Sequence, residues 1–555
     1  MRFLTLMLYC LGLLAAVRAE GEPREQTPWR NQPEGWPLQQ FEAFYLRPDT
    51  PGVVPIAIPE RWRNQTVHYT LKDYTGKTVR QESAACKDDL RLNLTLPAGW
   101  YELAFTEMPG VTSGILVFPE VRKPLDPFFG MNSFSCGWIN ENRPELVRRI
   151  AGLMPRLGIS NSRVCFYWRW GNPKPGEFIS NKLPEKFTAD ELRAKLTLDE
   201  ISACEELGVP VLIALQRAPD HLKKSGSCYP DDYPESLESC VRILRILKGK
   251  LDSVEAWNEP DIFFGDYLPA DRYAVIPKLL AAAKERSGAK ISLVGGVVTH
   301  WMKKGFLEQM AANDVPEICD AMSFHSYEPP STLAGKIGEY RKFLPPGTPL
   351  WLTEAGAYYR NTGKINDYLA LTQEQENRIA QRTASLSAEA KALGIARCYP
   401  FIFCYYTSST ERGGLTKRDL TPARGIAAYA QLIDATANRE YSGKLELADP
   451  QVIARCFGGN LAVIYTDEPE SQPTVELPFT PASIRGIDGR EIPVSGRRVT
   501  VSNGMIYVYA PETIAGTVPP PQPSDVRHVA ITTPPLLLAP EFPEGAAGMI
   551  PSQGW

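Results

Sequence analysis

The stretch Val254-Glu255-Ala256-Trp257-Asn258-Glu259-Pro260-Asp261 is a short apolar segment that runs into a cluster of polar residues. Proline has no backbone N–H and restricts the residue before it to extended conformations, so we expect Glu259 where a strand ends and a loop begins. A carboxylate at that position, beside an amide and an indole, is poorly explained as core filling. The stretch therefore predicts a buried strand that presents a functional carboxylate at its end.

A second apolar run ends in the same way. Leu350-Trp351-Leu352-Thr353 leads into Glu354, and Gly356 follows almost at once. Glu354 lies 95 residues after Glu259, which corresponds to about three strand–helix units of roughly thirty residues each.

Between about Phe128 and Ala437 the chain alternates between strand and helix patterns eight times. Eight such units over ~300 residues favour a (β/α)8 TIM barrel at residues 123–437 over an open doubly wound sheet. The strands are expected to end near Ser133, Phe166, Leu215, Trp257, Val294, His325, Thr353 and Phe403.

Helical spacing of apolar residues fills the intervals between these strands. Residue 277 is a proline inside the helical pattern 271–286 and predicts a kink or a broken start there. Two helix faces are predicted, one from Leu146, Ile150, Leu153 and Leu157 and one from Ile201, Cys204 and Leu207.

Short alternating patterns flank the barrel on both sides. In residues 37–122, Leu90-Arg91-Leu92-Asn93-Leu94-Thr95-Leu96 has leucine at every second position, which predicts an N-terminal β-sandwich. Runs such as Leu461-Ala462-Val463-Ile464-Tyr465 predict a smaller C-terminal β-domain at residues 440–512. Residues 513–555 are Pro-rich without periodicity and are expected to be extended or disordered.

Residues 1–19 have the pattern of a secretory signal peptide, with Arg2 before an apolar run and small residues before Glu20. The run is shorter than the ~20 residues of a spanning helix, so we expect a secreted or periplasmic protein without a membrane span. Removing the signal changes the net charge from −4 to −6, with both signs interspersed. This balance argues against a nucleic-acid partner.

The eleven cysteines are scattered without CxxC pairs or histidine partners, which makes a zinc site improbable. Cys165, Cys204 and Cys398 fall in apolar patterns and are expected to be buried thiols. A Cys228–Cys240 disulfide is left open by the sequence.

In a barrel of this kind, reactive groups gather on the loops after the carboxyl ends of the strands. Glu259 and Glu354 meet that requirement on the fourth and seventh strands. Each glutamate alone could be only a solvated loop charge, but strands four and seven face each other across the barrel mouth. Two carboxylates with an amide and an indole suit acid–base chemistry in a sugar pocket, with Trp257 stacking on a ring and Asn258 binding a hydroxyl.

The chain resembles glycoside hydrolase clan A, the retaining β-glycosidases on a (β/α)8 barrel. The motifs Trp257-Asn258-Glu259-Pro260-Asp261, Ser323-Phe324-His325-Ser326-Tyr327 and Thr353-Glu354-Ala355-Gly356 especially resemble glycoside hydrolase family 39 and its relatives. The resemblance implies Glu259 as the acid/base and Glu354 as the nucleophile of a double displacement. It also implies that Arg163, on strand two, lies near the nucleophile, although a structural salt bridge is nearly as good an explanation.

The resemblance further implies a pocket role for His325 and Tyr327, which are two positions apart and can project to one side of strand six. Among the aromatic residues near strand ends, Trp138, Trp168 and Tyr405 are expected to line the pocket, and Gln216 to bind a hydroxyl. Most of the clan carries a tryptophan on strand eight, whereas the segment 397–406 contains none.

Other chemistries lack their motifs. The sequence contains no G-x-G-x-x-G or P-loop at a helix start, no G-x-S-x-G and no H-E-x-x-H. We therefore expect no cofactor and no metal, and a carbohydrate as the substrate. The remaining alternative is a catalytically inactive, secreted carbohydrate-binding protein on the same barrel. The sugar, its linkage, exo or endo action and the oligomeric state are left open.

Overall fold

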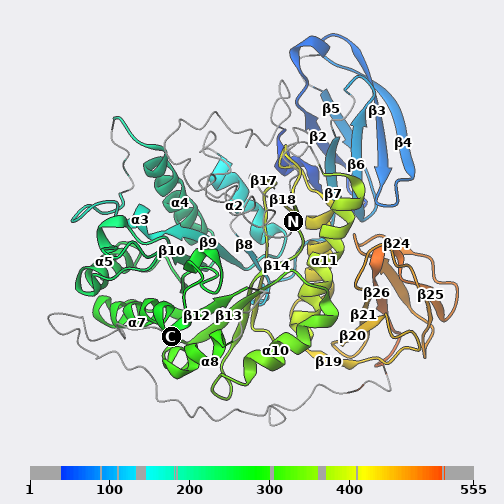
Figure 1. Ribbon diagram of the computed structural model, residues 1–555. Helices are drawn as coiled ribbons and strands as arrows, with labels where there is room; N and C mark the ends of the chain where they lie inside the picture. Colours follow the sequence, from blue (N-terminus) through cyan, green and yellow to red (C-terminus); the bar gives the residue numbers. More distant parts are fainter. Residues whose placement is uncertain are drawn as a thin grey trace, which may run out of the picture.

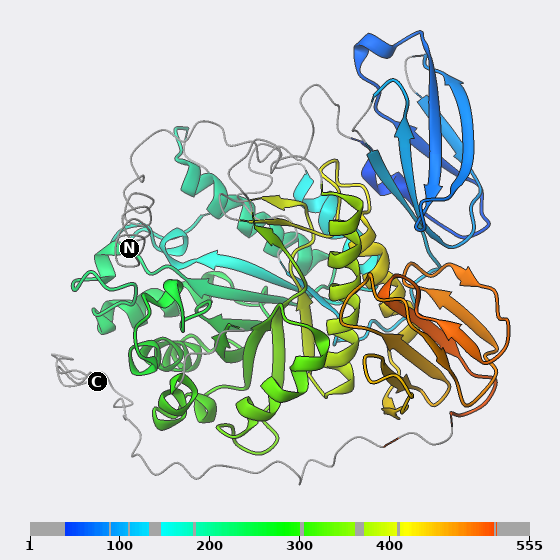
Figure 2. The same cartoon turned by 45° about the vertical axis from the view of Figure 1, so that its right-hand side comes forward.

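The computed structural model describes residues 39–87, 90–108, 112–132, 146–180, 182, 185–299, 305–360, 371–407, 411–514 and 518. The expected signal peptide, Trp138 and nearly all of the segment 513–555 lie outside the described residues. The chain forms a central barrel with two β-domains packed on one side of it (Figure 1). Figure 2 shows the same arrangement, with the N-terminal domain above the C-terminal one.

The barrel contains eight parallel strands whose spatial order follows the chain. The ends of the sheet meet where the backbone N–H of Cys398 donates to Phe128 O at 2.9 Å, which closes the barrel. The strands are β8 (Gly130–Asn132), β9 (Asn161–Tyr167), β10 (Val211–Gln216), β11 (Ser253–Ala256), β12 (Ser292–Val298), β13 (Ala321–Ser326), β14 (Leu350–Ala355) and β16 (Arg397–Pro400). The predicted fold class, a TIM barrel with flanking β-domains, is confirmed.

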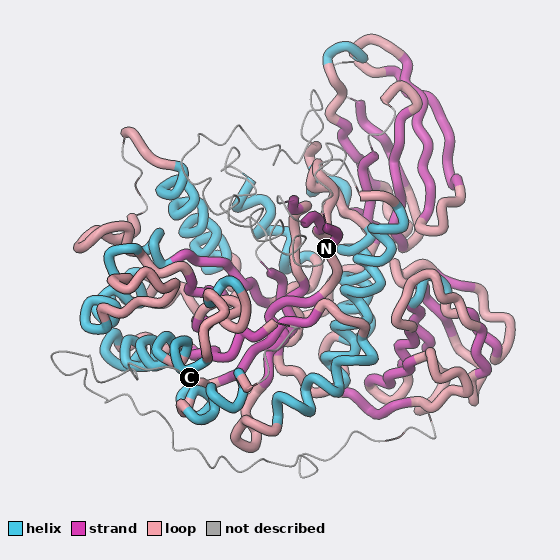
Figure 3. The backbone as a smooth tube through the Cα atoms, in the orientation of Figure 1, coloured by secondary structure: helices cyan, strands magenta, loops and turns pink. Residues whose placement is uncertain are grey.

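Every residue of β10, β13 and β14 is buried. Parallel strands of this kind are covered on the outside by helices and on the inside by side chains that fill the barrel. Figure 3 shows the helices arranged around the central strands. They are α2 (Leu146–Arg156), α3 (Trp168–Gly171), α4 (Ala189–Glu206), α5 (Tyr233–Ile246), α6 (Ala270–Tyr273), α7 (Val275–Ser287), α8 (Phe306–Ala312), α9 (Val315–Ile318), α10 (Leu333–Arg341), α11 (Gln373–Ala392) and α12 (Arg424–Thr436).

Some element boundaries differ from the predicted ones. β12 continues beyond Val294 to Val298 through a register shift that follows Gly296, where φ is +87° and glycine accommodates the irregular backbone. β16 ends three residues before Phe403, because the chain then leaves the barrel towards a small sheet. Leu207 is 41% exposed rather than on a buried face, because α4 ends one residue before it.

The broken helix start at Pro277 is confirmed. The short α6 ends at Tyr273, and Pro277 lies in the first turn of α7, where a missing N–H costs no intrahelical hydrogen bond.

A three-stranded antiparallel sheet that the sequence did not reveal lies after β14 and β16. It consists of β15 (Tyr359–Arg360), β18 (Glu411–Gly413) and β17 (Tyr406–Thr407), in that order. Strands of two or three residues carry too little pattern to be recognised in a sequence.

The N-terminal domain is a sandwich of a five-stranded and a two-stranded sheet. The alternating leucines 90, 92 and 94 point into its core, as their spacing predicts. Its strands are β1 (Tyr45–Leu46), β2 (Gly52–Ile56), β3 (Thr66–Asp73), β4 (Thr78–Ala85), β5 (Leu90–Leu94), β6 (Gly99–Phe105) and β7 (Thr112–Val117), with short 3-10 turns at Phe41–Phe44 and Glu60–Trp62.

The C-terminal domain contains a six-stranded antiparallel sheet and a two-stranded one. Its strands are β19 (Tyr441–Lys444), β20 (Ile453–Phe457), β21 (Leu461–Tyr465), β22 (Thr474–Glu476), β23 (Ser483–Gly486), β24 (Glu491–Ile492), β25 (Arg498–Thr500) and β26 (Met505–Tyr509), and a 3-10 turn at Ser502–Gly504 precedes β26.

All three parts meet at Trp100, which belongs to the N-terminal sandwich and is fully buried. Its indole N–H donates to Pro422 O of the barrel at 2.8 Å, and its backbone N–H donates to Asp488 of the C-terminal domain at 2.9 Å. The guanidinium of Arg424 lies 4.4 Å from the ring centroids of both Trp100 and Tyr74. These contacts make the two β-domains part of one packed body with the barrel.

Cys228 and Cys240 are both free thiols, so the pairing that the sequence left open is not formed. Cys204 and Cys398 are buried as expected, whereas Cys165 is half-buried. Among the described residues, every helix is too short or too polar to cross a membrane.

The Trp100 junction yields a prediction for stability. Replacing Trp100 with alanine removes a buried aromatic ring, its hydrogen bond to Pro422 O and its contact with Arg424, while the backbone bond to Asp488 stays. We expect the change to cost about 3–5 kcal/mol of unfolding free energy. Chemical denaturation followed by far-UV circular dichroism, which reports on the backbone, measures this loss. Val79→Ala, at an exposed position of β4, serves as the control and should change stability by less than about 0.5 kcal/mol. Equal stability of the two variants would contradict this role of Trp100.

Candidate active site

Two glutamates that are remote in the chain meet at the carboxyl ends of the barrel strands. Glu259 follows β11, the fourth strand, and Glu354 lies near the end of β14, the seventh. His325 Nδ1, on the sixth strand, is 2.8 Å from Glu259 Oε1 and 3.5 Å from Glu354 Oε2. One oxygen of each glutamate and a ring nitrogen of His325 lie within 4.8 Å of one another.

The backbone at Glu259 differs from the extended conformation that Pro260 predicts. Glu259 has φ +46°, in the left-handed region that non-glycine residues rarely occupy. Its N–H donates to Val297 O at 3.1 Å, and its carboxylate is bound to His325, so contacts from β12 and β13 hold it there. Such strain, on the order of 1–3 kcal/mol, persists where the surroundings over-determine the conformation, as they do in functional sites.

Glu354 is held by donors on both oxygens. Arg163 Nη1 donates to Oε1 at 2.8 Å, and the hydroxyl of Tyr327 donates to Oε2 at 2.5 Å. Burial acts to raise the pKa of Glu354, but the charges of His325 and Arg163 and the bond from Tyr327 outweigh it and hold the pKa below its usual value. Glu354 is therefore ionised at neutral pH.

Arg163, from β9, is buried at the centre of this network. Its Nε donates to Glu255 Oε2 at 2.7 Å, and its Nη2 to Asn258 Oδ1 at 2.8 Å, in addition to the bond to Glu354. Burial acts to lower the pKa of Arg163, but the carboxylates of Glu255 and Glu354 raise it, so the guanidinium stays charged. Arg163 forms a structural ion pair with Glu255 and also contacts Glu354, so both expectations for it apply together.

Glu255 and Asn132 also belong to this network, although neither was predicted from the sequence. Glu255 is fully buried and accepts a second bond from Ser323 Oγ at 2.7 Å. Asn132, at the end of β8, faces Arg163 Nη1 at 3.4 Å. A charged residue inside the apolar run of β11 was a usable signal for Glu255, because a buried charge requires a partner.

Asn258 is oriented by its bond to Arg163. Because Oδ1 accepts from Nη2 of that arginine, the Nδ2 group of the amide is left to donate. This arrangement is compatible with the expected contact to a hydroxyl.

His325 and Tyr327 project to the same side of β13, as their spacing predicts, and both contact the glutamates. Burial acts to lower the pKa of His325, but the charge of Glu354 and the hydrogen bond to Glu259 raise it. Burial, together with the charges of Glu354 and Glu259, raises the pKa of Tyr327, so its hydroxyl keeps its proton. His325 thus lies between two carboxylates that favour its protonated form.

Two aromatic residues that were expected to contact a sugar pack inside the protein. Trp168 is fully buried, and its indole N–H donates to Ser239 of α5 at 2.8 Å, so it packs between the barrel and its outer helices. Trp257 is likewise buried, with its ring against Tyr229 and its N–H bound to Phe264 O. Aromatic residues at strand ends are needed for packing as well as for ligands, and the sequence does not distinguish the two uses.

Gln216 and Tyr405 were also expected to contact the ligand. Gln216 is buried at the end of β10, and its Nε2 donates to Cys165 Sγ at 2.8 Å. Tyr405 is buried, with the guanidinium of Arg418 5.5 Å from its ring centroid. Their contact with a ligand stays a prediction, as does that of Trp138, which lies outside the described residues.

A third carboxylate, Glu411 of β18, was not foreseen. Burial and the charges of Glu354 and Glu259 raise its pKa to about 7. The small sheet that carries it is joined to the glutamates through Tyr358, whose ring centroid is 5.0 Å from that of Tyr327. Phe401, on the segment after β16, lies 6.4 Å from Tyr327 by the same measure. The sequence around Glu411 has no pattern that predicts a site residue, because Glu411 lies in the small sheet rather than on a barrel strand.

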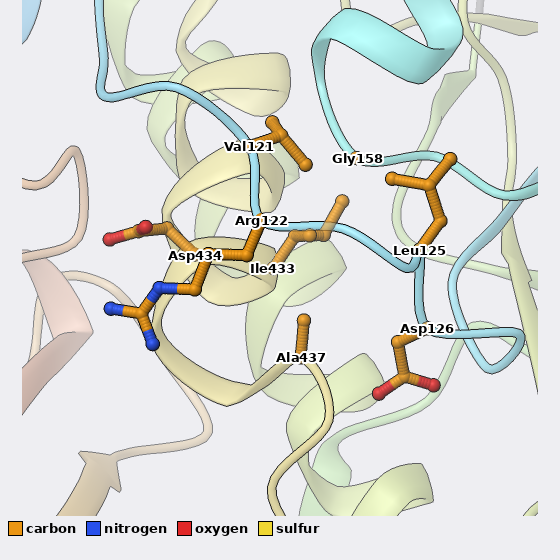
Figure 4. Close-up of a pocket in the computed structure, with 8 residues that line it drawn as sticks. All are labelled: Val121, Arg122, Leu125, Asp126, Gly158, Ile433, Asp434 and Ala437. Atoms are coloured by element: carbon orange, nitrogen blue, oxygen red, sulfur yellow. The ribbon is translucent and has the colours of Figure 1, made fainter.

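A separate small pocket lies between the segment 121–126, Gly158 and the end of α12 (Figure 4). Gly158 precedes β9, so this pocket is at the amino-terminal end of the barrel, away from the two glutamates. In barrels of this type that face serves stability rather than chemistry.

Glu259, His325 and Glu354 could also offer ligands to a metal ion. In the structure these atoms already bind one another or other protein groups. Arg163 and Tyr327 donate to both oxygens of Glu354, and His325 Nδ1 faces Glu259. A buried guanidinium beside the carboxylates replaces the charge that a cation would supply. A site without metal or cofactor stays our prediction.

The fold is similar to that of a family 39 glycoside hydrolase from the gut symbiont Bacteroides cellulosilyticus WH2. The match covers 85% of this chain and 100% of that chain, with a TM-score of 0.65 and 17% sequence identity. A glycoside hydrolase family 30 subfamily 8 xylanase from Clostridium acetobutylicum matches 70% of this chain and 97% of its own, with a TM-score of 0.45 and 13% identity. No family model and no curated protein matches the chain. The first likeness confirms the resemblance at the level of the fold, and the second is too low to be used further.

The raised pKa of His325 predicts a pH dependence of stability. A histidine whose pKa is raised in the folded state contributes stability below its unfolded pKa of about 6.5, and this contribution is lost as the pH rises through the folded value. We expect His325→Gln to cost on the order of 1–3 kcal/mol at pH 5.5 and clearly less at pH 9. Denaturation curves of both proteins at the two pH values measure the difference. A cost that is the same at both would show that His325 is not charged in the folded protein.

Proposed function

We propose that this protein is a retaining β-glycosidase that hydrolyses glycosidic bonds of oligo- or polysaccharides through Glu259 and Glu354. The observation that carries the proposal is the approach of the two carboxylates, whose nearest oxygens lie within 4.8 Å across His325. Retaining enzymes hold their carboxyl groups about 5–5.5 Å apart, whereas inverting enzymes need about 6.5–9.5 Å to admit a water. The similar fold of a family 39 glycoside hydrolase supports the reaction class.

In the first step Glu354 attacks the anomeric carbon, and the bond from that carbon to the leaving oxygen breaks. Glu259 gives its proton to that oxygen, so the leaving group departs as a neutral alcohol. Glu354 suits the role of nucleophile because the lowered pKa keeps it ionised.

In the second step Glu259 acts as the base. Glu259 takes a proton from a water, whose oxygen attacks the anomeric carbon and releases Glu354. Two inversions at one carbon give a product with the configuration of the substrate.

Arg163, Tyr327 and His325 act as positioning residues. Arg163 and Tyr327 direct the oxygens of Glu354, and His325 holds Glu259 at 2.8 Å. Fixed donors of this kind stabilise charge without reorganising during the reaction.

The site needs no cofactor for this reaction, and the substrate is a carbohydrate. Secretion follows from the expected signal at residues 1–19 and is part of the proposal. The alternative, a carbohydrate-binding protein without hydrolytic activity, makes the same contacts but predicts no turnover by the wild type.

Substitution of the two glutamates separates their roles. We expect Glu354→Ala to lose at least about 10³-fold in kcat/KM on every glycoside that the wild type hydrolyses, because no nucleophile remains. Glu259→Ala should lose about 10²–10⁴-fold on alkyl glycosides but little in the first step on β-glycosyl fluorides, since fluoride leaves without protonation. Added azide should restore turnover of Glu259→Ala by attacking the glycosyl-enzyme from the side of the missing carboxylate.

A panel of alkyl β-glycosides, 4-nitrophenyl β-glycosides and β-glycosyl fluorides measures these effects, with the exposed Glu339→Ala on α10 as the control. Proton NMR of the first-formed product gives the stereochemistry, and retention is expected. Equal turnover by the wild type and Glu354→Ala, or an inverted product, would overturn the proposed mechanism.

A further inference from the structure

The loop that follows Glu259 exposes two aromatic side chains. Phe263 and Tyr267 are 52% and 62% exposed, among the most exposed large apolar side chains of the described residues. They belong to a loop at the carboxyl end of β11, on the side of the barrel where the two glutamates lie. Large rings left in water at this position favour contact with a ligand.

The loop is folded tightly against the residue after Glu259. Ile262 N–H donates to Glu259 O at 3.3 Å, and Tyr267 N–H donates back to Ile262 O at 3.1 Å. A Cβ at Gly265 would lie 1.9 Å from Pro260 O, so only glycine permits this approach. The aromatic residues are therefore fixed close to Glu259 rather than carried on a loose segment.

Three further bonds anchor the loop to neighbouring elements. Trp257 Nε1 donates to Phe264 O at 2.9 Å, and Cys228 N–H donates to Asp266 at 2.7 Å. Asp261 accepts from Thr299 Oγ1 at 3.0 Å. The buried Trp257 thus supports the loop that carries the exposed rings.

Two rings of the loop form a stack with Arg217. The guanidinium of Arg217, just after β10, lies 5.1 Å from the ring centroid of Phe264. The rings of Phe264 and Phe263 are 4.1 Å apart between centroids, with an interplanar angle of 32°. Phe264 is half-buried, whereas Phe263 and Arg217 at the two ends of the stack are exposed.

We propose that Phe263 and Tyr267, backed by Phe264, form a platform that binds the sugar on the leaving-group side of the scissile bond. Glu259 protonates the leaving oxygen, so the leaving group must lie on the side of Glu259, and the platform belongs to the loop of that residue. Apolar faces of a pyranose ring pack well on such side chains. The substrate is accordingly a β-linked oligo- or polysaccharide rather than a small aryl or alkyl glycoside. This inference rests on the proposed function.

The test compares substrates that differ only in the leaving group. The β-fluorides of xylose, glucose, galactose and mannose carry no sugar on that side, whereas the matching β-1,4-linked tetrasaccharides do. In the variant Phe263→Leu with Tyr267→Leu, the ratio of kcat/KM for tetrasaccharide over fluoride should fall about 3- to 10-fold. Phe263→Tyr with wild-type Tyr267 keeps a ring and should retain the wild-type ratio.

Leu207→Ala, an exposed apolar residue at the far end of α4, is the matched control and should leave the ratio unchanged. A ratio within twofold of the wild-type value in the double leucine variant would overturn the platform.

A binding measurement keeps this inference separate from the proposed function. Calorimetric titration of Glu354→Gln with the four tetrasaccharides should give a dissociation constant about 3- to 10-fold higher when the two leucine substitutions are added. If the wild type hydrolyses none of the panel but binding weakens in this way, the proposed function fails and the platform stands. Equal binding by the two proteins, or binding by neither, would overturn the platform whatever the turnover.

Discussion

The site depends on one buried cation shared by two carboxylates. Arg163 lies inside the barrel, where removing its charge from water is costly, and Glu255 and Glu354 compensate that cost at 2.7 and 2.8 Å. The guanidinium also binds Asn258, so a single planar group connects the second, fourth and seventh strands. Removing the guanidinium would leave two buried carboxylates without their common cation. The same contacts that hold the interior of the barrel together therefore fix the orientation of Glu354.

The division of roles between the two glutamates follows from their surroundings. Glu354 receives Arg163 and Tyr327 directly, and its pKa is lowered despite burial. Glu259 receives His325 instead and carries no guanidinium contact among the described residues. Burial and the charges of both glutamates raise the pKa of a third carboxylate, Glu411, to about 7. Chemically identical side chains thus acquire different properties from the donors that face them.

The backbone conformation of Glu259 is set by contacts with neighbouring strands rather than by the local preference of a glutamate. Its φ of +46° is unfavourable for a glutamate, yet contacts from β12 and β13 maintain it. In the following loop, Gly265 packs against Pro260 O, and Trp257 donates a hydrogen bond to Phe264 O. Glu259 and the exposed aromatic rings are thereby held in one rigid unit. A frame of this kind suits a site in which a ligand must be aligned with a proton donor.

Sequence patterns determined the architecture and the two glutamates, because burial, strand period and proline or glycine breaks leave local signals. The eight strand–helix units, the alternating leucines 90–94 and the strand-end positions of Glu259 and Glu354 were all predictable in this way. Tertiary structure alone decided which side chains meet. Trp168 and Trp257 look like ligands for a sugar but pack in the core, while Glu255 and Glu411 reach the site without a motif of their own. The reason is physical: periodicity records whether a residue is buried, whereas its partner depends on strand register, loop path and barrel closure, which arise from contacts between distant parts of the chain.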